Sequence, residues 1–308
     1  MTQTLAELTR DHDVTGARWE EGEGGLPVLQ VRTPLCEARV FAHGAQIVSF
    51  TPVGQRPVLF LSPRSAFAPG KAIRGGVPVC MPWFGARAED PRPSGQASPA
   101  HGIARTRAWR VERVIVDDTE RVHVELTLPM GDETRALWSW PMSAVLKVSM
   151  GDTLELALQV RNTGIEAFDL EAALHSYLEV GDVTQVALLG LEDSPYLDKV
   201  NASGDARSAN GPLRLVGETD SIFLDTTSAV TVVDPVLGRR IVVEKEGSPC
   251  TVVWNPWRAK ATAMADLGED LWARFVCVES AVTRPRAVRL QPGAHHVLAT
   301  RLRVLPGC

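Results

Sequence analysis

Two acid–base side chains, His175 and Glu279, stand in apolar stretches of the sequence. Because side chains alternate along a strand, His175 is expected on the same face as Tyr177. Glu279 ends a second apolar run and is expected on the same face as Cys277. Near neutral pH an unperturbed glutamate is ionised and an unperturbed histidine exchanges a proton, so the pair has the chemistry of a general base and acid. Each residue also admits a structural role, as a histidine bonded within a sheet or a glutamate that ends a strand.

The charge distribution indicates a small anion site. The chain carries a formal net charge of -5, yet residues 64–113 hold nine basic and three acidic side chains. Arginine suits phosphate because its planar fork donates paired hydrogen bonds and stays charged near neutral pH. Two glycines follow Arg74, and their backbone amides can approach a ligand closely, although the Gly-Lys-Ser/Thr of a phosphate-binding P-loop is missing. The alternative is a solvated basic face whose arginines form surface ion pairs.

The cysteines and histidines show no spacing typical of a metal site. The five cysteines are scattered without a CxxC pair, which is typical of reduced thiols, and Cys80 and Cys277 in their apolar runs are expected to fill the core. His295 and His296 are adjacent on an expected strand, so they point to opposite faces and cannot chelate one ion. Without an HxH, HxxxH or cysteine-rich cluster, the sequence predicts no structural or catalytic metal.

Composition excludes several classes of protein. The chain has 308 residues, of which 44% are hydrophobic and 22% charged, a balance typical of a globular protein with a large core. The negative net charge and a pI of about 5.8 predict no nucleic-acid partner. The N terminus lacks the apolar stretch of a secretory signal, and no run reaches the roughly 18 apolar residues of a membrane-spanning helix. We therefore expect a cytoplasmic protein without membrane association.

The elements that must position these side chains are strands, because the dominant hydrophobic period is two. Residues 144–150 and 153–161 alternate around a tight MGD turn and predict a hairpin. No helical stripe of 12 or more residues occurs, and short helical turns are expected only near residues 4–10 and 63–67. We predict an all-β fold, a large antiparallel β-sandwich with few short helices that forms a single domain over residues 1–308.

Six motifs, in this order, resemble those of the hexose-6-phosphate mutarotases, or glucose-6-phosphate 1-epimerases, a branch of the aldose 1-epimerase (galactose mutarotase-like) superfamily. They are RGG-P-PWFG from Arg74, HG-AR from His101, LHSY-VGD from Leu174, ETD from Glu218, WNPW from Trp254 and CVE from Cys277. The resemblance implies a β-supersandwich that interconverts the α and β anomers of glucose 6-phosphate, or a related aldose 6-phosphate, without a cofactor. The implied reaction opens and closes the sugar ring, with His175 as general acid and Glu279 as general base.

The resemblance also implies which residues bind the substrate. Asp220 matches the family aspartate that contacts sugar hydroxyls. Arg74 and Arg105 match arginines that bind the substrate and recognise its phosphate, and His101 matches a histidine that binds or polarises the sugar. The implied partner is therefore a small-molecule sugar phosphate, bound by a monomer because the family's cleft lies within one domain.

Two other functions stay open at this point. An aldose 1-epimerase for unphosphorylated hexoses would use the same acid and base without an anion site. A non-catalytic carbohydrate-binding module would keep the tryptophan and arginine contacts and would need neither His175 nor Glu279. The sequence departs from the family at Ala100, where many relatives have glutamine, and at Met81, where tryptophan is common. Both departures leave the acid and the base in place.

Overall fold

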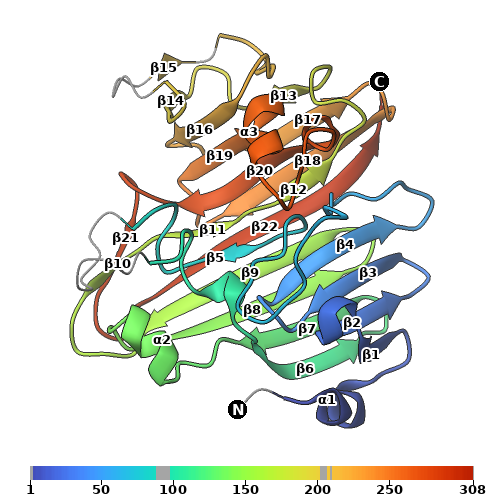
Figure 1. Cartoon of the computed structure of the whole chain (residues 1–308), viewed down its shortest axis with the longest axis vertical. Helices are drawn as coiled ribbons and strands as arrows, with labels where there is room; N and C mark the ends of the chain where they lie inside the picture. Colours follow the sequence, from blue (N-terminus) through green and yellow to red (C-terminus); the bar gives the residue numbers. More distant parts are fainter. Residues whose placement is uncertain (1–2, 88–97, 202–206, 209, 308) are drawn as a thin grey trace.

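Antiparallel strands make up most of the computed structural model, which describes residues 3–87, 98–201, 207–208 and 210–307 (Figure 1). The first sheet contains the N-terminal strands in the order β1 (Ala17–Glu21), β2 (Pro27–Arg32), β3 (Cys36–Phe41) and β4 (Gln46–Pro52). A second sheet has eight strands in the order β13 (Ala187–Leu189), β17 (Val230–Asp234), β18 (Arg239–Glu246), β22 (His295–Pro306), β9 (Leu154–Asn162), β8 (Met142–Met150), β7 (Val122–Thr127) and β6 (Arg110–Val116).

The third sheet matters most for the site, because it carries both acid–base residues. Its strands run in the order β15 (Arg207–Ser208), β14 (Pro195–Asp198), β16 (Thr219–Leu224), β19 (Cys250–Asn255), β20 (Phe275–Val282), β11 (Ala172–Leu174) and β5 (Val79–Cys80), with β12 (Tyr177–Glu179) also paired to β20. A small fourth sheet pairs β10 (Phe168–Leu170) with β21 (Val288–Leu290). Each strand from β14 to β11 in this order therefore has a hydrogen-bonded neighbour strand on both sides.

The two eight-stranded sheets enclose the core, as alternation predicts. Along β8 and β9 every second residue is buried, and the two strands pair through the turn after Met150. Leu158 of β9, Leu298 of β22 and Val278 of β20 belong to one hydrophobic cluster. Burying each such side chain stabilises the fold by about 1.5–3 kcal/mol. The predicted hairpin and the predicted antiparallel β-sandwich are both confirmed.

The described helices are short. They are α1 (Leu5–His12), α2 (Asp132–Leu137) and α3 (Trp257–Ala263), with 3-10 turns at Glu23–Gly25, Ala104–Thr106 and Trp272–Arg274. The helix expected near residues 4–10 is confirmed as α1, which begins with a capping box between Thr4 and Glu7. Each described helix is too short or too polar to cross a membrane.

The helical turn expected near residues 63–67 is wrong, because the segment forms a non-helical turn. The Ser62 hydroxyl accepts from the amide of Arg64 at 3.2 Å, and the Ser65 hydroxyl accepts from the amide of Arg74 at 2.7 Å. Serine side chains that bond to nearby backbone groups compete with the hydrogen bonds of a helix. These contacts instead fix the loop that carries Arg74.

Candidate active site

Strands β11, β12 and β20 bring His175 and Glu279 together. Both β11 and β12 pair antiparallel with β20, and His175 lies in the short break between them. The Nε2 atom of His175 lies 3.2 Å from Oε1 of Glu279. The exposed fractions of the two residues are only 7% and 1%. Residues far apart along the chain thus form one buried acid–base pair.

The break in the strand follows from local backbone hydrogen bonds. The amide of Ser176 donates to the carbonyl of Leu174 at 3.0 Å, and the amide of Val278 donates to the carbonyl of Ser176 at 3.2 Å. These contacts push His175 out of the regular ladder, and its own amide donates to Pro78 at 3.0 Å. The predicted shared face is nevertheless confirmed, since the rings of His175 and Tyr177 stack with their centroids 4.9 Å apart.

Burial controls the protonation of this pair. Loss of hydration raises the pKa of Glu279 well above its usual range and lowers the pKa of His175 well below its own. Among the described residues, His175 Nδ1 and both Glu279 oxygens have no aligned hydrogen-bond partner. Burial therefore favours a neutral imidazole beside a carboxylic acid, whereas ordinary pKa values would give an imidazolium beside a carboxylate. Both forms hold the same number of protons, so one proton transfer interconverts them.

Arg74 lies beside this pair and is held by two neighbours. Its Nε donates to Asp266 Oδ2 at 3.0 Å, and its Nη1 donates to the hydroxyl of Tyr177 at 2.9 Å. The positive charge of Arg74 also contributes to the lowered pKa of His175. The candidate arginine is thus oriented by the protein itself and retains donors on its remaining nitrogen atoms for a ligand.

The glycine pair after Arg74 serves packing, which differs from the interpretation made from the sequence. Gly75 and Gly76 have φ angles of 119° and 63°, in the region that glycine adopts most easily. A Cβ atom at Gly76 would overlap the carbonyl oxygen of Ile47, and the amide of Gly76 donates to Phe60 at 2.7 Å. The amide of Gly76 is therefore used within the protein, and the expectation that it approaches a ligand is wrong.

His101 and Arg105 approach the pair from the segment that ends in the 3-10 turn Ala104–Thr106. The His101 ring lies edge-on to His175 with the centroids 5.7 Å apart, and its φ is 62°. Burial lowers the pKa of His101 to about 3, so the ring is neutral. The amide of Gly85 donates to His101 Nδ1 at 3.4 Å, which leaves Nε2 as the protonated donor.

Arg105 supplies a second cation at the site. Its Nη2 donates to the carbonyl of Ala100 at 2.9 Å, whereas its buried Nε has no partner among the described residues. The Arg105 charge contributes to the lowered pKa values of His101 and His175. The positive charges of Arg105 and Arg74 therefore act on the same two histidines, His101 and His175.

Asp220 lies on β16 next to a lysine that the sequence interpretation missed. The Nζ atom of Lys199 lies 3.9 Å from Asp220 Oδ2, and the Lys199 amide donates to the Asp220 carbonyl at 2.8 Å. Burial raises the pKa of Asp220, and its charge raises the pKa of Glu279 further. Lys199 acts in the opposite direction on Glu279. No local motif marks this lysine, because the pairing of β14 with β16 alone places it there.

Cys277 also lies closer to His175 and Glu279 than its place in the sequence indicates. It is fully buried on β20, as expected of a core residue. It also lies with His175 and Glu279 in a cluster whose nitrogen, sulfur and oxygen atoms are all within 4.8 Å of one another. Strand pairing rather than sequence spacing brings this cysteine and the histidine together.

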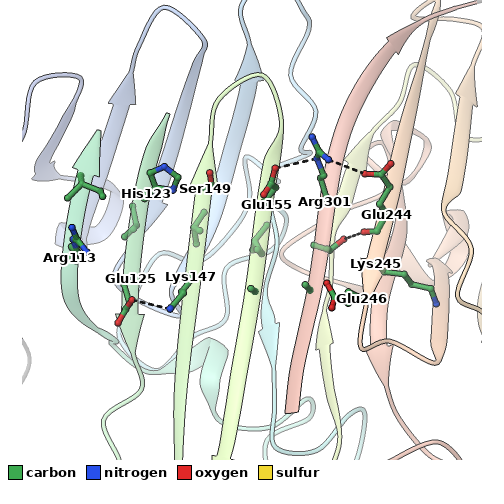
Figure 2. Close-up of a pocket in the computed structure, with 17 residues that line it drawn as sticks. Arg113, His123, Glu125, Lys147, Ser149, Glu155, Glu244, Lys245, Glu246 and Arg301 are labelled. Atoms are coloured by element: carbon green, nitrogen blue, oxygen red, sulfur yellow. Dashed lines mark hydrogen bonds and ion pairs between the residues drawn. The ribbon is translucent and has the colours of Figure 1, made fainter. Parts of the chain in front are cut away.

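A hollow lies away from these residues, on the eight-stranded sheet that contains β8 and β9. It measures about 540 Å³, and its charged side chains pair across neighbouring strands, as Figure 2 shows. Lys147 lies 3.7 Å from Glu125, and Arg301 lies 3.3 Å from Glu155. Of the described residues that line this hollow, none belongs to the candidate set around His175. Its charges neutralise one another, so we place the chemistry at the buried pair.

Proteins with similar sequences and folds are known. A relative from Escherichia coli, named "Putative glucose-6-phosphate 1-epimerase", is 33% identical over 280 residues, which cover 91% of this chain and 90% of the relative. A relative of the same name from Cenchrus ciliaris is 33% identical over 267 residues, which cover 84% of this chain and 78% of the relative. The crystal structure of a "putative mutarotase" from Salmonella typhimurium superposes with a TM-score of 0.87 at 30% identity and covers 95% of both chains.

More distant structures share the fold alone. The galactose 1-epimerase of Lactobacillus acidophilus superposes with a TM-score of 0.68 at 14% identity, over 95% of this chain and 99% of that one. The sequence itself matches the aldose 1-epimerase family over residues 27–303. This match includes the whole segment from Arg74 to Glu279 that forms the site. The chain belongs to the aldose 1-epimerase family.

Proposed function

We propose that this protein is a hexose-6-phosphate 1-epimerase, an isomerase that interconverts the α and β anomers of glucose 6-phosphate or a related aldose 6-phosphate. The observation that carries the proposal is the buried contact of 3.2 Å between His175 Nε2 and Glu279 Oε1. Membership of the aldose 1-epimerase family and the names of the relatives support the reaction and the substrate.

The reaction requires one proton to leave O1 of the sugar and one to reach the ring oxygen O5. In the proposed mechanism Glu279 accepts the proton from O1 while His175 donates a proton to O5, and the C1–O5 bond breaks to give the open aldehyde. Rotation about C1–C2 presents the other face of the carbonyl, and reclosure reverses both proton transfers. Neither a redox step nor a cofactor is required.

The acid–base pair must reach its ionised form before this step. Burial disfavours that form, and the Arg105 charge opposes protonation of His175. A phosphate dianion bound near Arg105 would offset this positive charge and thereby favour the imidazolium form. Binding of the phosphate would thus raise the fraction of molecules that can donate a proton to O5.

The proposed phosphate contacts come from three cations. Arg105 offers a buried Nε without a partner among the described residues, and Arg74 offers the donors that Asp266 and Tyr177 leave unused. Lys199 has the most exposed side chain of the three and lies at the edge of the site. In the same proposal His101 and Asp220 bond the sugar hydroxyls. Such contacts would orient C1 toward the catalytic pair.

Magnetisation-transfer NMR on the C1 protons tests this proposal directly. We expect exchange between the anomers of glucose 6-phosphate well above the spontaneous rate, and a loss of about 10²–10⁴-fold in His175→Ala and Glu279→Gln. Glu179→Gln is the matched control, because Glu179 lies on β12 and pairs with Arg274 at 2.9 Å, away from the pair. Absence of exchange in the wild-type protein would refute the proposal.

The same assay separates the two other functions. If free glucose exchanges as fast as glucose 6-phosphate, the protein is an epimerase of unphosphorylated sugars. Saturable binding of glucose 6-phosphate without exchange would identify a carbohydrate-binding module. We propose that the protein acts as a monomer with one domain over residues 1–308, and sedimentation equilibrium tests the monomer.

A further inference from the structure

Three buried side chains of the site have the chemistry of metal ligands. Ligand atoms of His175, Cys277 and Glu279 all lie within 4.8 Å of one another, and all three residues are buried. Cys277 and Glu279 are two positions apart on β20, so strand alternation places them on one face. His175 reaches the same point from the break between β11 and β12. The cluster is therefore built on paired strands and not on a loop.

These groups carry lone pairs that the protein does not use. His175 Nδ1 and both Glu279 oxygens lack an aligned hydrogen-bond partner within the described residues, although the two residues are only 7% and 1% exposed. Buried polar atoms without partners are rare in folded proteins. The two oxygens of the buried Glu279, one of which lies 3.2 Å from His175 Nε2, are a second indication that the cluster accepts an electron-deficient ligand.

The donor set fits one class of ion. Imidazole nitrogen, thiolate sulfur and carboxylate oxygen are the ligands of Zn²⁺, which commonly keeps a fourth position open where three protein ligands bind. Tetrahedral ligands at bond lengths of about 2.1–2.3 Å lie about 3.5 Å apart. The contact of 3.2 Å between His175 and Glu279 fits this spacing, and the ligand atoms of all three residues lie within 4.8 Å of one another.

The electrostatics of the site determine how such an ion would enter. A thiol and a carboxyl group bind such an ion in their deprotonated forms. The thiolate and carboxylate then neutralise the two positive charges, and the buried site gains no net charge. Arg74 and Arg105 oppose the ion, whereas Asp220 attracts it.

We propose that His175, Cys277 and Glu279 form an inhibitory site for a thiophilic divalent cation of the Zn²⁺ class. The ion would bind the imidazole and the carboxylate at once, so neither group would be available to exchange a proton with a sugar. The inhibitory consequence rests on the proposed function, whereas the binding of the ion does not.

Cobalt is the probe that separates these two statements. We expect the chelator-treated full-length protein to develop the near-ultraviolet thiolate-to-Co²⁺ charge-transfer absorption when Co²⁺ is added. Cys277→Ala should lose this absorption, and Cys277→Ser provides a second variant in case the alanine variant does not fold. Cys36→Ala is the matched control, because Cys36 is also a fully buried thiol but lies on β3 in another sheet. An unchanged absorption in a folded Cys277 variant, or no thiolate absorption in the wild type, would overturn the site.

Inhibition is measured separately, as the Zn²⁺ concentration that halves anomer exchange in each variant relative to its own uninhibited rate. We expect the Cys277 variants to require about 100-fold more Zn²⁺ than the wild type and the Cys36→Ala control, and EDTA to restore the wild-type rate. Equal sensitivity in all variants contradicts the proposal. A thiolate absorption in a protein that shows no anomer exchange would uphold the metal site and reject the proposed function.

Discussion

The guanidinium of Arg74 donates a hydrogen bond to the hydroxyl of Tyr177, with 2.9 Å between the nitrogen and oxygen atoms. The ring of Tyr177 stacks on His175 at a centroid distance of 4.9 Å. One tyrosine therefore links a cation that we assign to substrate binding with the imidazole that we assign to proton transfer. Asp266 holds the other side of Arg74, so the three side chains form a connected support for the site.

Tyr177→Phe tests this support. The substitution leaves a buried guanidinium donor without its acceptor, so we expect the free energy of unfolding to fall by about 1–3 kcal/mol in urea denaturation. Tyr196→Phe is the control, because Tyr196 is the second of the two tyrosines and packs on Phe223 at 4.9 Å. Equal stability of the two variants would show that the hydrogen bond to Arg74 does not stabilise the fold.

The pH dependence of stability tests the burial of His101. Its pKa falls from 6.5 to about 3 in the folded protein, so the unfolded chain binds the proton more readily. The stabilisation is complete above pH 6.5 and is lost as the pH falls toward 3, by at most about 1.4 kcal/mol per pH unit. His101→Asn should flatten this slope in urea denaturation, and asparagine tolerates the positive φ of 62°.

The same replacement at His295, an exposed residue of β22, controls for the loss of a histidine. We expect His295→Asn to keep the wild-type slope. If the His101 and His295 variants behave alike, the acid sensitivity of the protein arises elsewhere.

Lys199→Met tests whether the sequence missed a substrate contact. Because a hydrogen bond from a cation to phosphate contributes about 1.5–3 kcal/mol, we expect the KM for glucose 6-phosphate to rise about tenfold or more. The KM for free glucose should change much less. Lys147→Met is the control, since Lys147 lies 3.7 Å from Glu125 in the hollow away from the site. An unchanged KM for the phosphorylated sugar would remove Lys199 from the site.

Gly76→Ala tests the packing role of the glycine pair. The added Cβ would overlap the carbonyl of Ile47 and would also strain a φ of 63°, so we expect a loss of more than about 3 kcal/mol. Gly54→Ala measures the backbone strain alone, because Gly54 has a φ of 75° and an added Cβ would meet open space. We expect this variant to lose about 1 kcal/mol of unfolding free energy. Similar losses in thermal unfolding of the two variants would show that contact with Ile47 is unimportant.

The local parts of the fold were predictable from the sequence, and the long-range parts were not. Alternation alone predicted the hairpin of β8 and β9, because its strands are neighbours in the chain. The helices α2 and α3 have only six and seven residues, too few to show a helical period. The resemblance to a known family identified His175 and Glu279 as the candidate acid and base. Alternation predicted only which face of its own strand each side chain occupies.

What the sequence could not predict depends on strand pairing and burial. Cys277 meets His175 because β12 pairs with β20, and Lys199 meets Asp220 because β14 pairs with β16. The sequence also favoured an ionised acid–base pair, because the protonation of His175 and Glu279 could be judged only from the pKa values of exposed side chains. The loss of hydration that favours the neutral pair is a property of the folded sheet.

Every residue of β20 is buried, and β19 hydrogen-bonds to one edge of the strand while β11 and β12 hydrogen-bond to the other. The backbone that carries Glu279 cannot open without breaking ladders on both sides. Its amide hydrogens should consequently be among the slowest in the molecule to exchange with deuterium, at a rate set by global unfolding. The Glu279 carboxyl group therefore keeps a fixed position while a sugar binds. Any conformational change during turnover must occur in the segments around β20.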